Sequence, residues 1–166
     1  VLNGMSETAL KLAYLNLAEI SVNENLGDLW NTISERERDG LEAQNVKPGQ
    51  VCGYYDGDNA RMVVDGDHLD NGLTSAGIYA HEIAHAMDGP RGLLSGSAAW
   101  RRAGNSDILK VVEKDGKKTW ALTHYATTSP EEALAEYHRI LILEPKRAKD
   151  DFPECWKFFN DRGLVK

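Results

Sequence analysis

The sequence predicts a mainly helical α+β domain with a small β-sheet or hairpin before a central helix. Three observations predict it: apolar residues recur at helical spacing in several segments, two short β-rich segments precede the central one, and no repeat or linker divides the chain. A length of 166 residues suffices for one domain with its own core. We therefore expect a single domain over residues 1–166, with N-terminal helices at about 5–40, a sheet region at about 50–65, and helices at about 74–88 and 129–143.

The N-terminal part of the chain is expected to form two helices. From Ser6 to Ile20 the apolar residues fall at helical spacing and form one stripe. From Leu26 to Arg38 a second helix is expected, with charges on its outer side. Leu41 to Gln50 is then a loop, because Pro48 and Gly49 punctuate it.

A β-hairpin is expected next. Val51 to Tyr55 and Arg61 to Val64 are short and rich in β-formers, and a polar turn, Asp56-Gly57-Asp58-Asn59, lies between them. The acidic turn does not fit a calcium site, because its glycine and a distal glutamate are not where an EF-hand loop needs them.

The central helix is expected from Thr74 to Met87, where Gly89 and Pro90 stop it. A loop-rich stretch follows. Within it we expect a short helix from Ser106 to Glu113 and a strand or extended piece from Lys117 to Leu122.

A further helix is expected from Ser129 to Leu143. Ser129 is a natural N-cap, and Pro130 fits the first helical position. Pro145 ends this helix, and a final helix is expected from about Pro153 to Asp161.

Composition and charge argue against several classes of protein. Hydrophobic residues make up 42% and charged residues 27% of the chain, which is typical of a soluble globular protein. No apolar run approaches the roughly 20 residues that cross a bilayer, and no basic region followed by an apolar one suggests a signal peptide. A formal net charge of −7 would repel phosphate backbones. We therefore expect neither a nucleic-acid nor a membrane partner.

The two cysteines do not make a disulfide framework, and neither Cys52 nor Cys155 belongs to a CxxC pair. They could form one disulfide, but two buried thiols are the preferred interpretation.

The segment His81-Glu82-Ile83-Ala84-His85 has the pattern H-E-x-x-H. Residues four apart on a helix share a face, so His81 and His85 can bind one zinc ion while Glu82 reaches a water bound to it. A chance spacing on a surface helix is less favoured, because the flanking residues are apolar and unpaired His and Glu are costly inside a domain. The motif predicts Zn²⁺ as cofactor and Glu82 as catalytic base.

A catalytic zinc needs a third protein ligand, for which five residues downstream are candidates: His124, Glu131, Glu132, Glu136 and His138. Glu132 and Glu136 lie four apart on one helical face, so one can bind the metal while the other orients a ligand histidine. Spacing alone leaves Glu132 open, because it can equally complete a capping box with Ser129. Glu136 can also be a plain surface carboxylate.

Two segments carry a family resemblance: His81 to Gly89, and Tyr125 to Glu136, which reads Y-A-T-T-S-P-E-E-A-L-A-E. Together they resemble the catalytic domain of anthrax lethal factor, and equally the Mlc titration factor A peptidases and the Pro-Pro endopeptidases. The tail from Phe152 to Phe159 is similar to the last helix of these families. The resemblance runs from roughly Gly49 to the C-terminus, with a poorly matched middle loop.

The resemblance implies a zincin-like fold and a gluzincin-like ligand set in which Glu132 is the third ligand. It implies that Tyr125 donates a hydrogen bond to the developing oxyanion, a role that suits a phenol near zinc. Asp88 is expected to support a ligand histidine or to solvate the end of its helix. The chain departs from these families at Ala133-Leu134-Ala135, where bulky aromatics are usual, so the resemblance covers the ligands but not the packing behind the site or the substrate pocket.

The expected function is that of a zinc-dependent endopeptidase acting on a peptide or protein, with a secreted toxin or delivered effector favoured. The alternatives are a cytosolic regulatory peptidase of the titration-factor type and a zinc-bound interaction module without turnover. Neither the localisation, the oligomeric state nor the cleaved bond can be read from the sequence.

Overall fold

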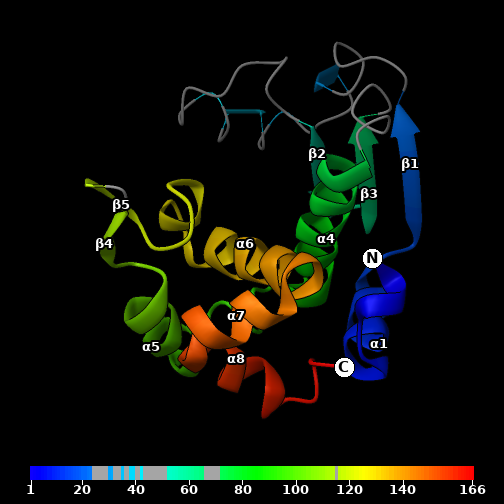
Figure 1. Ribbon diagram of the computed structural model, residues 1–166. Helices are drawn as coiled ribbons and strands as arrows, with labels where there is room; N and C mark the ends of the chain where they lie inside the picture. The colour runs from blue at the N-terminus through cyan, green and yellow to red at the C-terminus, as the bar shows by residue number, and fades with distance from the viewer. Residues whose placement is uncertain are drawn as a thin grey trace.

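The computed structural model describes residues 1–23, 30–31, 35, 38–39, 42, 52–65, 72–114 and 116–166. These residues form a mainly helical α+β structure (Figure 1). The helices are α1 (Glu7–Asn16), α4 (Gly72–Asp88), α5 (Ala98–Asp107), α6 (Pro130–Leu143), α7 (Pro145–Asp151) and α8 (Pro153–Asn160), with 3-10 turns η1 (Leu2–Gly4) and η4 (Tyr125–Thr127). The strands are β1 (Glu19–Asn23), β2 (Gly53–Asp56), β3 (Arg61–Asp65), β4 (Val111–Lys114) and β5 (Lys117–Trp120).

The larger sheet has the strand order β1-β3-β2. Strands β2 and β3 are antiparallel, with Tyr54 opposite Val63, and so confirm the expected hairpin. Asp56 closes its turn by accepting the backbone N–H groups of Asp58 and Asn59. The Asp56 carboxylate therefore has hydrogen-bond donors in the backbone of its own turn.

The first helix is shorter than expected. It begins after Ser6, whose hydroxyl accepts the Ala9 N–H, but it ends at Asn16 instead of reaching Ile20. Residues Glu19–Asn23 form β1, which pairs in parallel with β3 so that Ile20 lies opposite Met62. The prediction was wrong here because pairing with a distant strand overrides a local helical pattern.

The expected helix from Ser106 to Glu113 was also wrong. The helix lies earlier, as α5, and begins where the Ser97 hydroxyl accepts the Trp100 N–H. The β-branched pair Val111 and Val112 instead belongs to β4, which forms a hairpin with β5. The strand expected from Lys117 is confirmed.

The other helices match their expected positions closely. Helix α4 is the expected central helix, α6 begins after Ser129 as expected, and α8 is the expected last helix. Pro145 ends α6 but also starts α7, because proline suits the first turn of a helix. Helix α7 was not predicted from the sequence.

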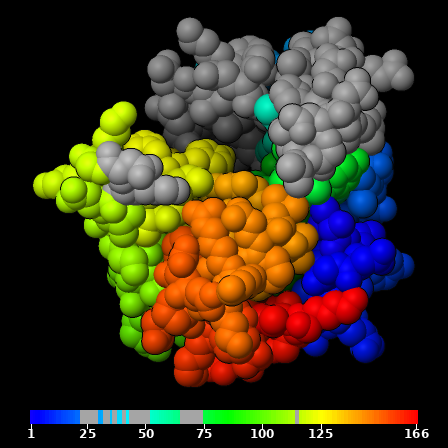
Figure 2. Space-filling model, viewed as in Figure 1, coloured from blue at the N-terminus to red at the C-terminus, as the bar shows by residue number. Residues whose placement is uncertain are grey.

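The core joins the helices around an aromatic cluster. Rings of Trp100, Tyr137, Phe158 and Phe159 pack with centroid distances of 5.2–6.1 Å and link α5, α6 and α8. In the space-filling view the C-terminal helices form one continuous face, bordered by α1 on one side and by α5 and the β4–β5 hairpin on the other (Figure 2). The aromatic cluster therefore holds α6, the helix that crosses α4, against α5 and α8.

Two predicted elements lie largely outside the described residues. They are the expected helix from Leu26 to Arg38 and the loop from Leu41 to Gln50.

The two cysteines, Cys52 and Cys155, are not joined in a disulfide, and the Cys155 thiol is buried. Among the described helices, none combines the length and apolar character needed to cross a membrane.

Candidate metal centre

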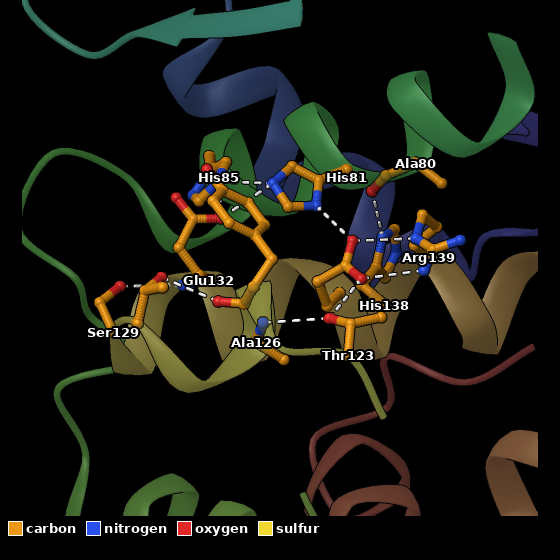
Figure 3. A network of polar contacts seen from close by, with 12 residues as sticks. Ala80, His81, His85, Thr123, Ala126, Ser129, Glu132, His138 and Arg139 are labelled. Carbon is orange, nitrogen blue, oxygen red and sulfur yellow. Dashed lines mark hydrogen bonds and ion pairs between the residues drawn. The ribbon is translucent and has the colours of Figure 1, made fainter. Parts of the chain in front are cut away.

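Helices α4 and α6 cross and bring together three side chains of the types that bind metals (Figure 3). His81 and His85 lie one turn apart on α4, and Glu132 lies in the first turn of α6. The His81 and His85 Nε2 atoms are 3.2 Å apart, and Glu132 Oε2 lies 3.0 Å from the first and 3.5 Å from the second. This group could hold a metal ion.

Glu132 takes part in the cap of α6 through its backbone, while its carboxylate is free to serve as a metal ligand. Its backbone N–H donates to the Ser129 hydroxyl at 3.1 Å and completes the N-terminal cap of α6. Its carboxylate extends toward the two imidazoles instead of back to the cap. The cap fixes the start of α6 and thereby the direction of the carboxylate.

The Glu132 Oε2 atom is buried and lies within ion-pair distance of the Nε2 atoms of His81 and His85, but it makes no well-directed hydrogen bond among the described residues. The ligand atoms of the three side chains all lie within 4.8 Å of one another. Two imidazoles and a carboxylate gathered in this way are the residue types expected of a cation site.

His81 makes a second contact on its other side. Its Nδ1 atom lies 3.1 Å from Glu136 Oε1, one turn along α6 from Glu132. Glu136 also receives two hydrogen bonds from Arg139 and one from Thr123, each 2.9 Å long. The structure thus places Glu136 in the position expected of a carboxylate that orients a metal-binding histidine.

Glu132 and Glu136 favour the protonated form of His81, and the histidines favour the ionised form of Glu132. Burial would lower the pKa of His81, but its contacts with Glu132 and Glu136 outweigh burial and raise that pKa to about 10. Burial would raise the pKa of Glu132, but the two imidazoles hold it well below its usual range. Without a metal, His81 is therefore a cation held between two anions at neutral pH.

Glu82 is buried beside the ligand group and faces strand β2. Burial raises its pKa, against the opposing effect of His81 and His85. A Cβ atom on Gly53 of β2 would lie only 3.0 Å from Glu82 Cγ and 3.1 Å from its Oε1. Glycine at this position therefore allows β2 to approach the Glu82 carboxylate closely.

Tyr125 begins the turn η4 and lies next to His81, with the rings stacked at a centroid distance of 5.8 Å. Partial burial, then the charges of Glu132 and Glu82, raise its pKa above the usual value. The phenol therefore keeps its proton over the neutral range and can donate a hydrogen bond at this edge of the site.

Asp88 does not contact the ligand histidines through its hydrogen bonds. Its Oδ1 atom accepts the backbone N–H groups of Leu94 and Ser95, at 2.6 and 2.9 Å. It therefore shapes the loop after α4 rather than solvating the helix end.

The other candidate ligands lie elsewhere. His124 and Glu131 are exposed, and the Glu131 carboxylate lies near the Ser95 hydroxyl. His138 is buried, with its pKa lowered by burial to about 4, and its Nδ1–H donates to the Ala80 carbonyl at 2.7 Å.

Three residues that shape this site are not predicted by any motif: Gly53, Thr123 and Arg139. For Arg139 a signal existed, since it follows Glu136 by three residues on the same helix. For Gly53 and Thr123 no local signal existed, because their contacts depend on how β2 and η4 pack against the helices.

Comparisons with known protein families, with curated proteins and with solved structures give no match to this chain. The resemblance to the lethal factor, titration factor and Pro-Pro endopeptidase group therefore stays a prediction based on the two motif segments.

Proposed function

We propose that this chain is a zinc-dependent endopeptidase with a zincin-like domain. The observation that carries the proposal is the convergence of His81, His85 and Glu132, with Glu82 and Tyr125 at the edges of the same group. Two histidines and one glutamate form the ligand set of a catalytic zinc site, in which a fourth position is left for water or substrate.

The spacing of the three ligand atoms is close to that of a tetrahedral zinc site. Bonds of about 2.0–2.2 Å in tetrahedral geometry place ligand atoms about 3.3–3.6 Å apart. Of the three distances here, 3.5 Å falls in that range, and 3.0 and 3.2 Å are slightly shorter. The Glu132 Oε2 atom makes no well-directed hydrogen bond among the described residues, which agrees with this assignment, since a cation would satisfy it.

A zinc ion in such a site lowers the pKa of a bound water to about 7 and polarises a carbonyl. In the proposed reaction the Glu82 carboxylate takes a proton from the attacking water and passes it to the leaving amine. Tyr125 donates a hydrogen bond to the negative charge that develops on the carbonyl oxygen. Glu136 keeps the His81 ring in place.

Strand β2 is an edge of the described sheet and lies beside Glu82. We infer that an extended substrate peptide adds to this edge through main-chain hydrogen bonds, as peptides commonly bind exposed strands. The substrate class is therefore a peptide or an unfolded protein segment.

The test is hydrolysis of a mixed peptide library by zinc-loaded protein, compared with the Glu82→Gln variant. Glutamine has nearly the same shape but cannot take the proton, and Glu82 is not among the three ligands. We expect cleavage by the wild type, none by the variant, and equal zinc content in both. A variant that is inactive and has also lost zinc would contradict the role given to Glu82.

The same experiment tests one alternative, since zinc binding without cleavage of any peptide would favour an interaction module. A second assay, digestion of whole-protein mixtures, tests the other, since cleavage restricted to one protein would favour a regulatory peptidase of the titration-factor type.

A further inference from the structure

The carboxylate of Glu136 is fully engaged on both oxygens. Oε1 contacts His81 Nδ1 at 3.1 Å and accepts Arg139 Nε at 2.9 Å. Oε2 accepts Arg139 Nη2 and the Thr123 hydroxyl, both at 2.9 Å. We propose that Arg139 and Thr123 are positioning residues that clamp Glu136 and so fix the His81 ring for the metal. This inference rests on the proposed function, because it presumes a metal at His81.

The Arg139–Glu136 pair differs from an ordinary surface ion pair. Two parallel N–H bonds join the guanidinium to the carboxylate, and the Glu136 side chain is only 9% exposed. Helix α7 offers a comparison, since Arg147 and Glu144 have the same spacing of three residues but are 38% and 48% exposed. Both Arg147 bonds come from one nitrogen, at 3.2 and 3.4 Å. Exposed pairs of that kind contribute little, whereas a two-bond fork fixes geometry.

Arg139 is also held against the neighbouring helix. Gly77 of α4 lies one turn before His81, and a Cβ atom there would meet Arg139 Cδ at 3.5 Å. The stem of Arg139 therefore runs along the face of α4 that also carries His81. The clamp thus spans the crossing of the two helices that supply the metal ligands (Figure 3).

Thr123 connects the clamp to a third element. Its hydroxyl donates to Glu136 Oε2 and accepts the Ala126 N–H at 3.0 Å. Ala126 belongs to the turn η4, which begins at Tyr125. One hydroxyl therefore links the support of His81 to the backbone that carries Tyr125.

The clamp determines which nitrogen of His81 faces the metal. An ionised Glu136 that receives two bonds from Arg139 can only accept a further hydrogen bond. A neutral His81 ring must then carry its proton on Nδ1, which leaves the Nε2 lone pair directed at the metal group. Losing Arg139 or Thr123 frees Glu136 to turn away, and loss of a carboxylate that orients a metal-binding histidine typically changes metal affinity by about 10–100-fold.

The experiment measures zinc dissociation constants by competition with a chelating indicator, for Arg139→Gln, Thr123→Val and the matched control Arg147→Gln. We expect zinc affinity to fall about 10–100-fold in Arg139→Gln, and less in Thr123→Val, with no change in the control. Thr123→Ser, which restores the hydroxyl, should recover the wild-type value. Arg139→Lys should remain impaired, because lysine keeps the charge but lacks the fork.

Folding is checked by circular dichroism, and the Co²⁺ absorption spectrum reports the ligand geometry independently of activity. A shift of the Co²⁺ bands in the single variant Thr123→Val, with unchanged secondary structure, would support the clamp. Folded Arg139→Gln and Thr123→Val proteins with wild-type zinc affinity would overturn this inference and leave the proposed function standing. A wild type that binds no zinc would overturn both.

Discussion

Replacing Gly53 by alanine tests the close approach of β2 to the proposed catalytic base. The added Cβ would lie 2.5 Å from Ile78 Cγ2 and 3.0 Å from Glu82 Cγ. Ordinary carbon contacts are about 3.5–4.0 Å long, so the strand and helix must separate by about 1 Å. Ile78 cannot yield easily, because a β-branched side chain on a helix has one strongly preferred rotamer.

The magnitude follows from that displacement. Overpacking of this kind costs about 1–3 kcal/mol of stability, which for a domain of this size lowers Tm by roughly 2–12 °C. A shift of about 1 Å at a catalytic group can cost about 100-fold in rate. Zinc content should not change, because neither Gly53 nor Ile78 supplies a ligand.

The assay is a thermal melt together with zinc analysis and peptide hydrolysis. Gly104→Ala is the matched control, since nothing lies within 4 Å of its added Cβ and the residue is in helix α5. Alanine there should be neutral or stabilising by about 0.5–1 kcal/mol. A Gly53→Ala protein with wild-type Tm and activity would refute the claim that β2 is fitted against Glu82.

Three further predictions follow from the described contacts. Because the pKa of metal-free His81 is about 10, zinc binding at pH 8.5 should release about one proton from His81, measurable by calorimetry in buffers of different ionisation heat. In the metal-free protein, the stability contributed by His81 should be complete below about pH 6.5 and lost as the pH rises toward 10. The stability contributed by Glu136, whose pKa is lowered to about 2, should be lost as the pH falls below about 4.5. Thermal melts at a series of pH values test both expectations. Asp107→Ala should destabilise by about 1–3 kcal/mol in a denaturant titration, because Asp107 accepts two backbone N–H groups at the start of α8, whereas the exposed Asp161→Ala should change little.

The parts of the fold that the sequence predicted are those with local signals. Ser129 and Pro130 marked the start of α6, and the polar turn from Asp56 to Asn59 marked the hairpin. Strand β1 was missed because only its pairing with β3 makes Glu19–Asn23 extended. Helix α5 was misplaced because Ser97, its cap, lies in a stretch that reads as loop.

The same distinction holds at the site. H-E-x-x-H placed His81 and His85 on one face of a helix, as helical geometry requires. Spacing could not decide between the capping box and a metal ligand for Glu132, because the direction of its carboxylate, which lies beside His81 and His85 and not at the cap, depends on how α6 packs against α4. The contacts of Asp88 with the loop after α4, and of Thr123 with Glu136, depend on tertiary packing and had no local signature.

The most direct test of the central claim is elemental analysis of the purified wild type and of two neighbouring variants, Glu132→Ala and Glu131→Ala. Glu131 is the matched control, because it lies in the same first turn of α6 but outside the ligand group. We expect near-stoichiometric zinc in the wild type and in Glu131→Ala, and clearly reduced zinc in Glu132→Ala. A wild type without zinc even after zinc is supplied, or a Glu132→Ala variant that retains zinc fully, would contradict the proposed metal site.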